Sequence, residues 1–406
     1  MTRVLLGVCG GVSFYKSFEI LRALQKRGFE VSVALSKGAS EFVTPLAYEG
    51  LGARVLTQQN ASWSGGLNHI EFSKADLLLL APATANTLAK VACGVADDVF
   101  LQTLLAYGGG GGMRVVAPAM NWRMWQNAAT QRNVEFLKQS GWEFVNPVCK
   151  TLACGETGEG GLAEVEVIVA SAVRALRQKR LWRGRKVVVT GGATCEKIDD
   201  VRGVTNFSSG KFAKAIADAF FYAGAEVTLL HSAVQKAGQK WSFEGEVLPY
   251  ECVKFQSSAS LLDLLNKQDL TPRDLLVMNA AVSDFLPALT QNGKVKKQNF
   301  ALNLELKENV DLLKSLASKC KKVGFKLEMC QEEVAVANAR QSLEKRGLDA
   351  VCLNILQADE SGSIFFGSDK TQIRFLQKSG CLLSSFADKS EVAGELVGFC
   401  EGLFEA

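Results

Sequence analysis

The sequence lacks the features that mark membrane, nucleic-acid-binding and secreted proteins. Its apolar runs stay short of the roughly 18 to 20 residues that a membrane span needs, and the run at residues 77–81 ends at Pro82. No long block of like charge occurs, because 46 basic residues are dispersed among 42 acidic ones, so a nucleic-acid partner is not required. Strand-like sequence begins at Arg3 in place of a signal peptide, which favours a cytoplasmic protein without a membrane partner.

Scarce histidine and unpaired cysteine argue against metal and disulfide chemistry. The eleven cysteines are scattered, odd in number and without a CxxC pair, so neither a disulfide framework nor a zinc ribbon is expected. Cys149 and Cys154 lie close together, but only His69 and His231 are available to complete a metal site. We therefore expect mostly buried thiols here and no metal held by side chains.

What the sequence does contain is the balance of a globular α/β protein, with 48% apolar residues, 37 glycines and only 7 prolines. Residues 3–8 and 31–35 read as strands on either side of a glycine turn and a helix. In that helix Ile20, Leu21 and Leu24 follow helical spacing. The same pattern restarts after Gly184, with a strand, a glycine turn, a helix at 211–223 and a strand at 225–230.

This repetition predicts two domains, since a chain of 406 residues exceeds the size at which one core keeps growing. A basic segment at 179–184 separates the two starts. We predict domains at residues 1–178 and 182–406, both α/β and Rossmann-like with open parallel sheets. Further strands are predicted near Leu77, Val115, Leu275, Lys322 and Ala350, and helices near Asn86, Gln126, Val310 and Glu332.

Small polar groups follow the predicted strands of the first half. The turn GVCGGV, with Gly10 and Gly11, could admit a phosphate to the helix N-terminus, or it could merely pack strand against helix, since it is not GxGxxG. Ser36 follows the second strand, and PATANT follows a third with Thr84, Ala85, Asn86 and Thr87. Open sheets bind ligands outside the carboxyl ends of strands, so these groups suit a flavin. Helix capping by Thr84 or Asn86 explains them equally well.

Three further residues have side chains suited to proton transfer or carboxylate binding. His69 follows a polar, glycine-bearing loop and could act as a base near neutral pH, although a lone histidine is more often structural. Asn121, in APAMNWRMWQN, could hold a carboxylate. Cys154, in the glycine-rich LACGETGEG, could deliver a proton.

The order of these motifs resembles a known family. GVCGGVSFYK, FVTPL, His69, PATANT, GVADD, PAMNWRMW and LACGETGEG follow one another between residues 7 and 160. They resemble the homo-oligomeric, flavin-containing cysteine decarboxylases, and the whole chain resembles the bifunctional phosphopantothenoylcysteine decarboxylase and phosphopantothenate–cysteine ligase. The resemblance implies a flavodoxin-like first domain that binds FMN through Gly10, Gly11, Ser36 and the segment Thr84 to Thr87.

The resemblance also implies roles for the three candidate residues. The flavin would oxidise the cysteine side of the substrate to a thioaldehyde, which makes loss of carbon dioxide feasible, and would then return a hydride. His69 would be the base, Asn121 would hold the departing carboxylate, and Cys154 would protonate the product during the final reduction. The chain departs from the family pattern after CGxxGx, where Gly160, Gly161 and Leu162 replace glycine, arginine and methionine.

The second half contains a glycine turn and a hydroxyl-rich segment before its first helix. Ser208, Ser209, Gly210 and Lys211 would suit a phosphate, although the segment is not a P-loop and simple helix capping is also compatible with it. MNAAVSDF, with Asp284, ends a predicted strand. The segment GKVKK follows, and Lys294 is the first of its three lysines. It could neutralise a triphosphate or could be a solvated surface loop.

These segments, together with DDVRGVTNFSSGK, ENVDLL, GFKLE and LNILQADESGSIFFGSD, resemble the ligase domain of the same bifunctional family. The resemblance implies that a nucleotide, usually CTP, activates a carboxylate that cysteine then attacks, with Mg²⁺ carried by the nucleotide. Asp284, Lys294 and Phe325 would contact the nucleotide, while Arg202 and Asn206 would handle 4'-phosphopantothenate and its acyl intermediate. Cys195, Val310 and Ser342 stand where arginine, proline and lysine are usual.

We therefore expect two fused enzymes of coenzyme A synthesis, with a trimer-based decarboxylase and a dimeric ligase. One alternative is a flavin-binding regulatory subunit of the same fold, which loss of His69, Asn121 or Cys154 would indicate; all three are present. A second alternative, an NAD-dependent dehydrogenase, is disfavoured because neither glycine turn gives GxGxxG with an acidic residue about 20 positions later.

Overall fold

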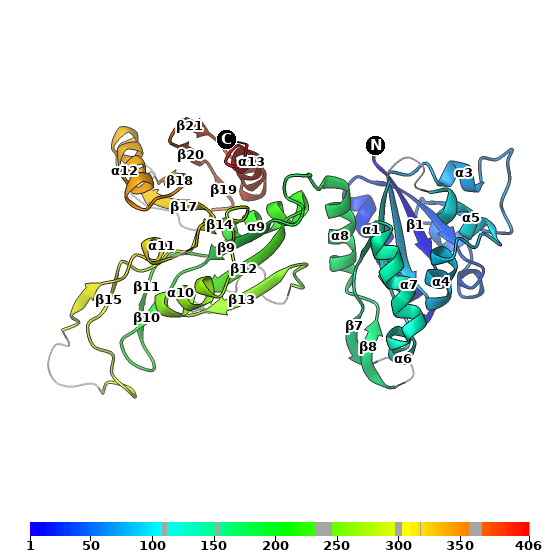
Figure 1. Ribbon diagram of the computed structural model, residues 1–406, viewed down its shortest axis with the longest axis horizontal. Coiled ribbons are helices and arrows are strands. Elements are labelled where there is room, and N and C mark those ends of the chain that lie inside the picture. Colours follow the sequence, from blue (N-terminus) through cyan, green and yellow to red (C-terminus); the bar gives the residue numbers. More distant parts are fainter. Residues whose placement is uncertain are drawn as a thin grey trace. The chain divides into compact units, whose positions relative to one another are not determined.

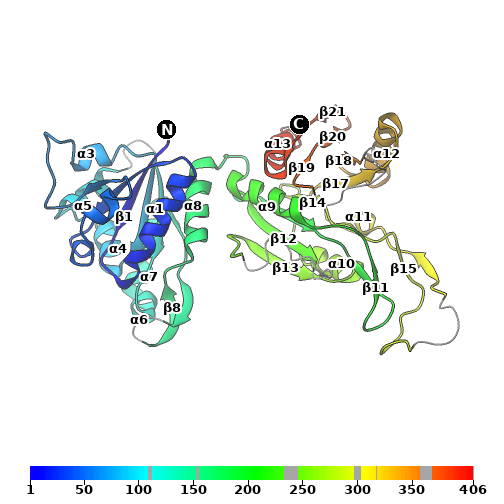
Figure 2. The ribbon, with the colours of Figure 1, turned by 180° about the vertical axis from the view of Figure 1, so that it is seen from behind.

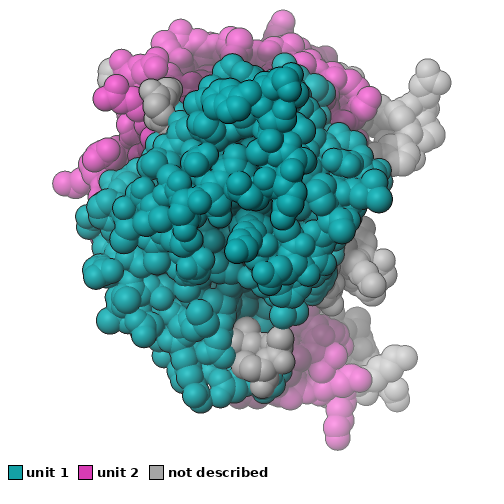
Figure 3. Space-filling model, turned by 90° about the vertical axis from the view of Figure 1, so that its right-hand side faces the viewer, with its two compact units in different colours: residues 1–177 teal, residues 178–406 magenta. Residues whose placement is uncertain are grey.

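The computed structural model describes residues 1–107, 112–151, 155–232, 246–296, 303–316, 318–356 and 368–405. The chain forms two compact units, unit 1 at residues 1–177 and unit 2 at residues 178–406 (Figure 3). Each unit has its own parallel sheet with helices packed against it (Figures 1 and 2). The predicted α/β class with an open, mainly parallel sheet in each half is confirmed.

Unit 1 contains a six-stranded parallel sheet in the order β3-β2-β1-β4-β5-β6. Its strands are β1 (Arg3–Val8), β2 (Glu30–Leu35), β3 (Arg54–Leu56), β4 (Leu77–Ala83), β5 (Met113–Pro118) and β6 (Trp142–Phe144). A separate antiparallel hairpin pairs β7 (Val148–Thr151) with β8 (Thr157–Gly161). This strand order is that of the Rossmann fold, and flavodoxin has a different one. Unit 1 therefore shares the doubly wound α/β architecture of flavodoxin but not its strand order.

The helices of unit 1 are η1 (Val12–Tyr15), α1 (Lys16–Lys26), η2 (Ala39–Glu41), α2 (Leu46–Glu49), α3 (His69–Phe72), α4 (Ala85–Ala92), α5 (Val99–Ala106), α6 (Trp122–Gln126), α7 (Ala128–Gln139) and α8 (Val165–Arg177). The helical spacing noted in the sequence is borne out in α1, where Ile20, Leu21 and Leu24 are buried against the sheet. Several helices begin at a side chain that accepts a backbone N–H, as Asp98 does at the start of α5. The strands β1 and β4 are apolar almost throughout because helices cover both faces of the sheet.

Unit 2 repeats this plan with two added strands. Its eight-stranded sheet has the order β13-β12-β9-β14-β17-β18-β20-β21, in which β20 is antiparallel to both of its neighbours, β18 and β21. The strands are β9 (Lys186–Gly191), β12 (Glu226–Ser232), β13 (Glu251–Phe255), β14 (Leu275–Met278), β17 (Lys321–Glu328), β18 (Ala350–Ile355), β20 (Arg374–Gln377) and β21 (Gly380–Leu383). Three short pairs complete it: β10 (Cys195–Lys197) with β11 (Gly203–Thr205), β15 (Phe285–Pro287) with β16 (Leu306–Glu308), and β19 (Lys370–Thr371) with β22 (Ala387–Asp388).

The helices of unit 2 are α9 (Lys211–Ala223), α10 (Ser258–Asn266), α11 (Leu312–Ser315), α12 (Glu332–Lys345) and α13 (Lys389–Glu401). Trp182 ties the start of this unit to its last helix. Its ring is fully buried, packs edge-on against Phe220 and Phe404, and donates from Nε1 to Glu401 at 3.1 Å.

In both units the first strand lies beside the fourth, β1 beside β4 and β9 beside β14. Connections leave these two strands toward opposite faces of the sheet, which opens a crevice at their carboxyl ends. We call the edge at which the parallel strands of a unit end its carboxyl edge, and the edge at which they begin its amino edge. Among the described residues, no helix is long and apolar enough to cross a bilayer.

Candidate functional sites

The carboxyl edge of unit 1 collects most of the polar residues singled out in its sequence. Gly10 and Gly11 follow β1, Ser36 follows β2, Thr84 follows β4 and Asn121 follows β5. Backbone contacts keep these loops together, since Cys9 N donates to Pro82 O at 3.2 Å and Ser36 N donates to Val8 O at 3.1 Å. Motifs far apart in the sequence therefore meet at the switch point of the sheet.

Gly10 permits a close approach of two backbones at this edge. A Cβ atom at Gly10 would lie 2.4 Å from the carbonyl carbon of Gly38 and 2.8 Å from its Cα atom. Gly11 has more room, because a Cβ there would meet only Thr84 Cγ2 at 3.9 Å. The loops after β1 and β2 thus lie in direct contact, and a side chain at Gly10 would force them apart.

The segment after β4 caps a helix at this carboxyl edge. Thr84 Oγ1 accepts from Thr87 N at 3.3 Å and caps α4, so the alternative that Thr84 is a helix cap is confirmed. Asn86 is exposed, Ala85 is half-buried and Thr87 is buried. Cys9 packs against Thr84 and Thr87, and burial raises its pKa to about 11, so this thiol stays neutral.

Asn121 is held at the carboxyl edge by the start of α6. Its Oδ1 accepts from Arg123 N at 2.9 Å, which orients the side-chain amide at the start of this helix. The β7–β8 hairpin packs against this segment, with Met120 N donating to Gly160 O at 2.9 Å. A Cβ at Gly160 would lie 2.3 Å from Met120 O, so the contact requires glycine.

Glu156, the residue before β8, fixes the opposite end of the same strand. Trp122 Nε1 donates to Glu156 Oε2 and Arg123 Nη2 donates to Oε1, both at 2.8 Å. Cys154, the predicted proton donor, lies outside the described residues. The flanking strands of its hairpin are nevertheless anchored beside Asn121.

His69 does not lie at the carboxyl edge. It begins the single-turn helix α3, in which Phe72 packs under the Arg54 guanidinium at the start of β3. Two residues later Lys74 O accepts from Arg3 Nη2 at the start of β1, so α3 belongs to the amino edge. The six residues of β1 at about 3.3 Å each separate the two edges by about 20 Å. Figures 1 and 2 agree in showing α3 and α6 at opposite ends of the unit.

The carboxyl edge of unit 2 contains a cavity of about 1100 Å³. It is lined by six of the residues expected to bind nucleotide or substrate: Asn206, Ser208, Ser209, Gly210, Asp284 and Phe325. These come from the loop before α9, the loop after β14, and β17, so the switch point brings three distant motifs into one site.

The loop before α9 is shaped by Gly210, whose φ of 70° is left-handed. A Cβ there would lie 2.8 Å from His231 Nε2, so a side chain has no space. Burial lowers the pKa of His231 to about 4, which keeps this imidazole neutral behind the loop. Asn206 Nδ2 donates to Val282 O at 3.2 Å and joins the loop to the end of β14.

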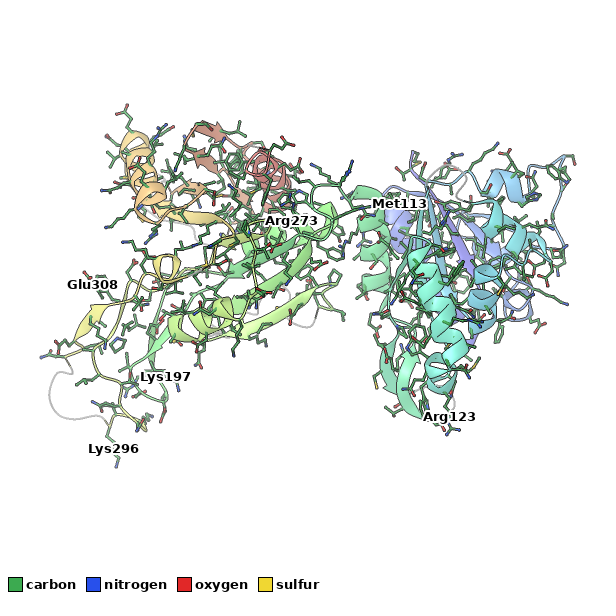
Figure 4. All side chains as sticks on the ribbon, viewed as in Figure 1. Met113, Arg123, Lys197, Arg273, Lys296 and Glu308 are labelled. Atoms are coloured by element: carbon green, nitrogen blue, oxygen red, sulfur yellow. The ribbon has the colours of Figure 1, made fainter. Side chains whose placement is uncertain are left out.

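Arg202, Lys211 and Lys294 lie outside the lining of this cavity. Arg202 instead pairs with the buried carboxylate of Asp199, its Nε donating to Oδ2 at 3.0 Å. The same Oδ2 accepts from Val295 N at 3.1 Å, and Arg202 Nη2 donates to Val295 O at 2.9 Å. The Asp199–Arg202 pair therefore anchors the loop that contains Lys294. Figure 4 shows Lys197 and Lys296, which flank this contact, together at one end of unit 2.

Comparisons with known proteins match the two units to two separate families. Residues 1–177 match the family described as Flavoprotein, and residues 182–402 match the family of the DNA/pantothenate metabolism flavoprotein C-terminal domain. The coenzyme A biosynthesis bifunctional protein CoaBC of Bacillus subtilis is 36% identical over 389 residues, which is 93% of this chain and 91% of the relative. The chain belongs to this bifunctional family.

Two further CoaBC proteins match over most of their length. That of Thermococcus kodakarensis is 34% identical and covers 91% of this chain and 88% of its own length. That of Escherichia coli is 30% identical, with 97% and 95% covered. A solved structure of the DNA/pantothenate metabolism flavoprotein from Streptococcus pneumoniae is 24% identical, covers 54% of this chain and 99% of its own, and has a TM-score of 0.44.

At two positions where the chain departs from the family pattern, Gly161 and Ser342, a nearby side chain supplies a positive charge. The Lys150 side chain occupies the space that a side chain at position 161 would need, because a Cβ at Gly161 would lie 2.2 Å from Lys150 Cε. Lys150 Nζ donates to Leu162 O at 2.6 Å and so braces the hairpin. Beside Ser342, the Arg346 guanidinium lines the unit 2 cavity and pairs with Asp311 at 2.8 Å.

Sequence reasoning missed Arg346 and Lys389 as cavity residues. Neither belongs to a glycine-rich or acidic motif, and only the fold brings them to the carboxyl edge. Within the described ranges, no group of three or more histidine, cysteine, aspartate or glutamate side chains is placed to hold a metal ion.

Proposed function

We propose that this member of the family catalyses two consecutive steps of coenzyme A synthesis. Unit 2 ligates cysteine to 4'-phosphopantothenate, and unit 1 decarboxylates the product to 4'-phosphopantetheine. The main support is that both carboxyl edges gather the motif residues of their respective reactions, Gly10, Thr84 and Asn121 in unit 1 and Asn206, Asp284 and Phe325 in unit 2. Relatives that match both halves favour catalysis over a regulatory role.

Unit 1 fits FMN at its carboxyl edge. η1 begins after Gly11 without a side-chain cap, so a phosphate could be held by the backbone amides at its start. Ser36 and the segment Thr84 to Thr87 would hold the remainder of the flavin. When bound, FMN supplies a reversible acceptor for two electrons. Asn121 would bind the substrate carboxylate, next to the hairpin that carries Cys154.

His69 as the base requires a second copy of the chain. Within one copy α3 lies at the amino edge, remote from Asn121. A homo-oligomer that places the amino edge of one unit 1 against the carboxyl edge of another would unite the two residues. This requirement supports the expected oligomeric decarboxylase.

In unit 2 we assign the cavity to a nucleotide, with CTP as the expected one, and to 4'-phosphopantothenate. The backbone around Ser208 to Gly210 suits a phosphate, and Phe325 offers a ring that packs edge-on to Phe212 at 5.7 Å. Asp284 would bind the base or ribose through its carboxylate. Mg²⁺ would enter with the nucleotide, and Lys294 would reach it from the loop gripped by Asp199 and Arg202. We expect the enzyme to be cytoplasmic and the ligase unit to dimerise.

One preparation tests both assignments. The purified protein should be yellow and release FMN on denaturation. With magnesium it should consume CTP, 4'-phosphopantothenate and cysteine and evolve carbon dioxide in step. A colourless protein that binds no added FMN would refute the unit 1 assignment. A folded protein that ligates with neither CTP nor ATP would refute that of unit 2.

A further inference from the structure

Lys389 is the first residue of α13 and lines the unit 2 cavity. Its backbone is fixed by the pairing of β19 with β22 and by the hydrogen bond from Lys389 N to Asp369 O at 2.9 Å. The Lys389 side chain is therefore attached to a fixed backbone at the cavity wall, on the side of the cavity formed by Thr371 and Ile373.

The charge of Lys389 is balanced differently from that of the other cavity cations. Among the described lining residues, Lys326 Nζ lies 3.2 Å from a Glu328 carboxylate oxygen, and Arg346 Nε lies 2.8 Å from one of Asp311. The recorded hydrogen bond of Lys389 Nζ goes to the backbone carbonyl of Ser368. A carbonyl carries no net charge, so this hydrogen bond does not neutralise the positive charge of Lys389.

A second ammonium lies beside it. Lys211, the first residue of α9, pairs at 2.8 Å with Asp369, whose side chain is 81% exposed. Burial, and next the charge of Lys211, lower the pKa of Lys389. The charge of Asp369 acts in the opposite direction on Lys389, so one carboxylate faces two ammonium groups at a half-buried position. This leaves a net positive charge that an anion would balance, which is the pattern expected of a binding site.

We propose that the Lys389 ammonium binds a phosphate group in the unit 2 cavity, with Lys211 as the second cation at that group. This inference rests on the proposed ligase function, because both the nucleotide and 4'-phosphopantothenate bring a phosphate to this cavity. The shared chemistry is a phosphate oxyanion held by two ammonium groups, and kinetics can distinguish its source.

The test compares Lys389→Met, which keeps the length of the side chain, with Lys389→Arg, which keeps its charge. Lys378→Met, at the exposed turn between β20 and β21, is the matched control. For each full-length variant, KM is measured separately for CTP and for 4'-phosphopantothenate. Calorimetric binding of CTP, of 4'-phosphopantothenate and of inorganic pyrophosphate is measured in parallel, and the thermal midpoint together with unit 1 decarboxylation reports correct folding.

Lys389→Met should raise KM about tenfold or more for the substrate whose phosphate it holds, while Lys389→Arg stays within about threefold of the wild type and Lys378→Met is unchanged. The substrate affected identifies the source of the phosphate. Unchanged KM values and unchanged binding of all three probes in a folded Lys389→Met protein would overturn the proposal. If the wild type does not ligate, the calorimetric comparison still decides the role of Lys389, and only the ligase assignment fails. Should Lys389→Met not fold, Lys389→Gln serves in its place.

Discussion

Arg202 donates from Nε to the buried carboxylate of Asp199 at 3.0 Å, and its Nη2 donates to Val295 O at 2.9 Å. The same carboxylate accepts from Val295 N, one residue after Lys294. A ligand-binding role for Arg202 remains a prediction, but its geometry already gives it a positioning role. The hydrogen bond from Arg202 holds the pKa of Asp199 well below its usual range.

Asp199→Asn should therefore impair the ligase by releasing the loop of Lys294. An amide cannot accept all of the hydrogen bonds that the carboxylate accepts, so we expect kcat/KM of ligation to fall about tenfold or more while decarboxylation is unchanged. Wild-type ligation by Asp199→Asn would show that the loop does not need this anchor.

The same pair predicts how stability depends on pH. Because the pKa of Asp199 is lower in the folded state, its contribution is present above about pH 4, the value for an unfolded aspartate, and is lost as pH falls toward the folded pKa. The thermal midpoint of wild-type unit 2 should drop between about pH 4 and pH 2 more steeply than that of Asp199→Asn. Parallel curves for the two proteins would contradict this.

Gly10→Ala should destabilise unit 1 and expel FMN. The added methyl group would lie within 2.4 to 2.8 Å of three Gly38 backbone atoms, which must shift. Overpacking of this kind costs about 1 to 3 kcal/mol, and the shift would disturb the proposed phosphate contact. The measurements are the thermal midpoint and the flavin content of purified protein. Gly65→Ala is the matched control, because a Cβ there meets nothing closer than 3.8 Å.

The regular parts of the fold follow from local patterns. The helix predicted at 211–223 has the observed bounds of α9, and a left-handed glycine lies at each end, Gly210 and Gly224. Apolar runs such as that of β4 predicted buried parallel strands, and the glycine turns predicted where each domain begins. These signals are local, so a single sequence contains them.

The parts that escaped prediction depend on contacts between distant segments. The partner of Arg202 on the Lys294 loop, the cavity positions of Arg346 and Lys389, and the placement of α3 at the amino edge are set by tertiary packing. His69 illustrates the limit, since its motif indicated a base but gave no information about which edge of the sheet it would occupy. The hairpin before α8 was likewise seen only as a glycine-rich loop.

Unit 2 should fold and ligate alone. Trp182 is buried entirely within it, and Lys179 N donates to Ala223 O at 2.7 Å, so a fragment beginning at residue 178 keeps these anchors. A fragment of residues 178–406 should match the full chain in ligase kcat. A fragment beginning at residue 184, without Trp182, should be less stable by about 3 to 5 kcal/mol, as for loss of a buried aromatic side chain. Equal unfolding midpoints for the two fragments would remove Trp182 from this role.

His69 and Asn121 should act in the same reaction although they lie at opposite edges of one unit 1. His69→Asn and Asn121→Ala should each lower decarboxylation about 100-fold or more, as for loss of a positioned base or binding group, without loss of FMN. If the site forms between copies, co-expression of the two variants should restore part of the activity, because some interfaces combine an intact His69 with an intact Asn121 from different chains. A chain that carries both substitutions, co-expressed with wild type at the same ratio, is the control for dilution. Mixed oligomers of the two single variants that form but remain as inactive as either variant alone would place the complete site within one copy, or would remove His69 from the chemistry.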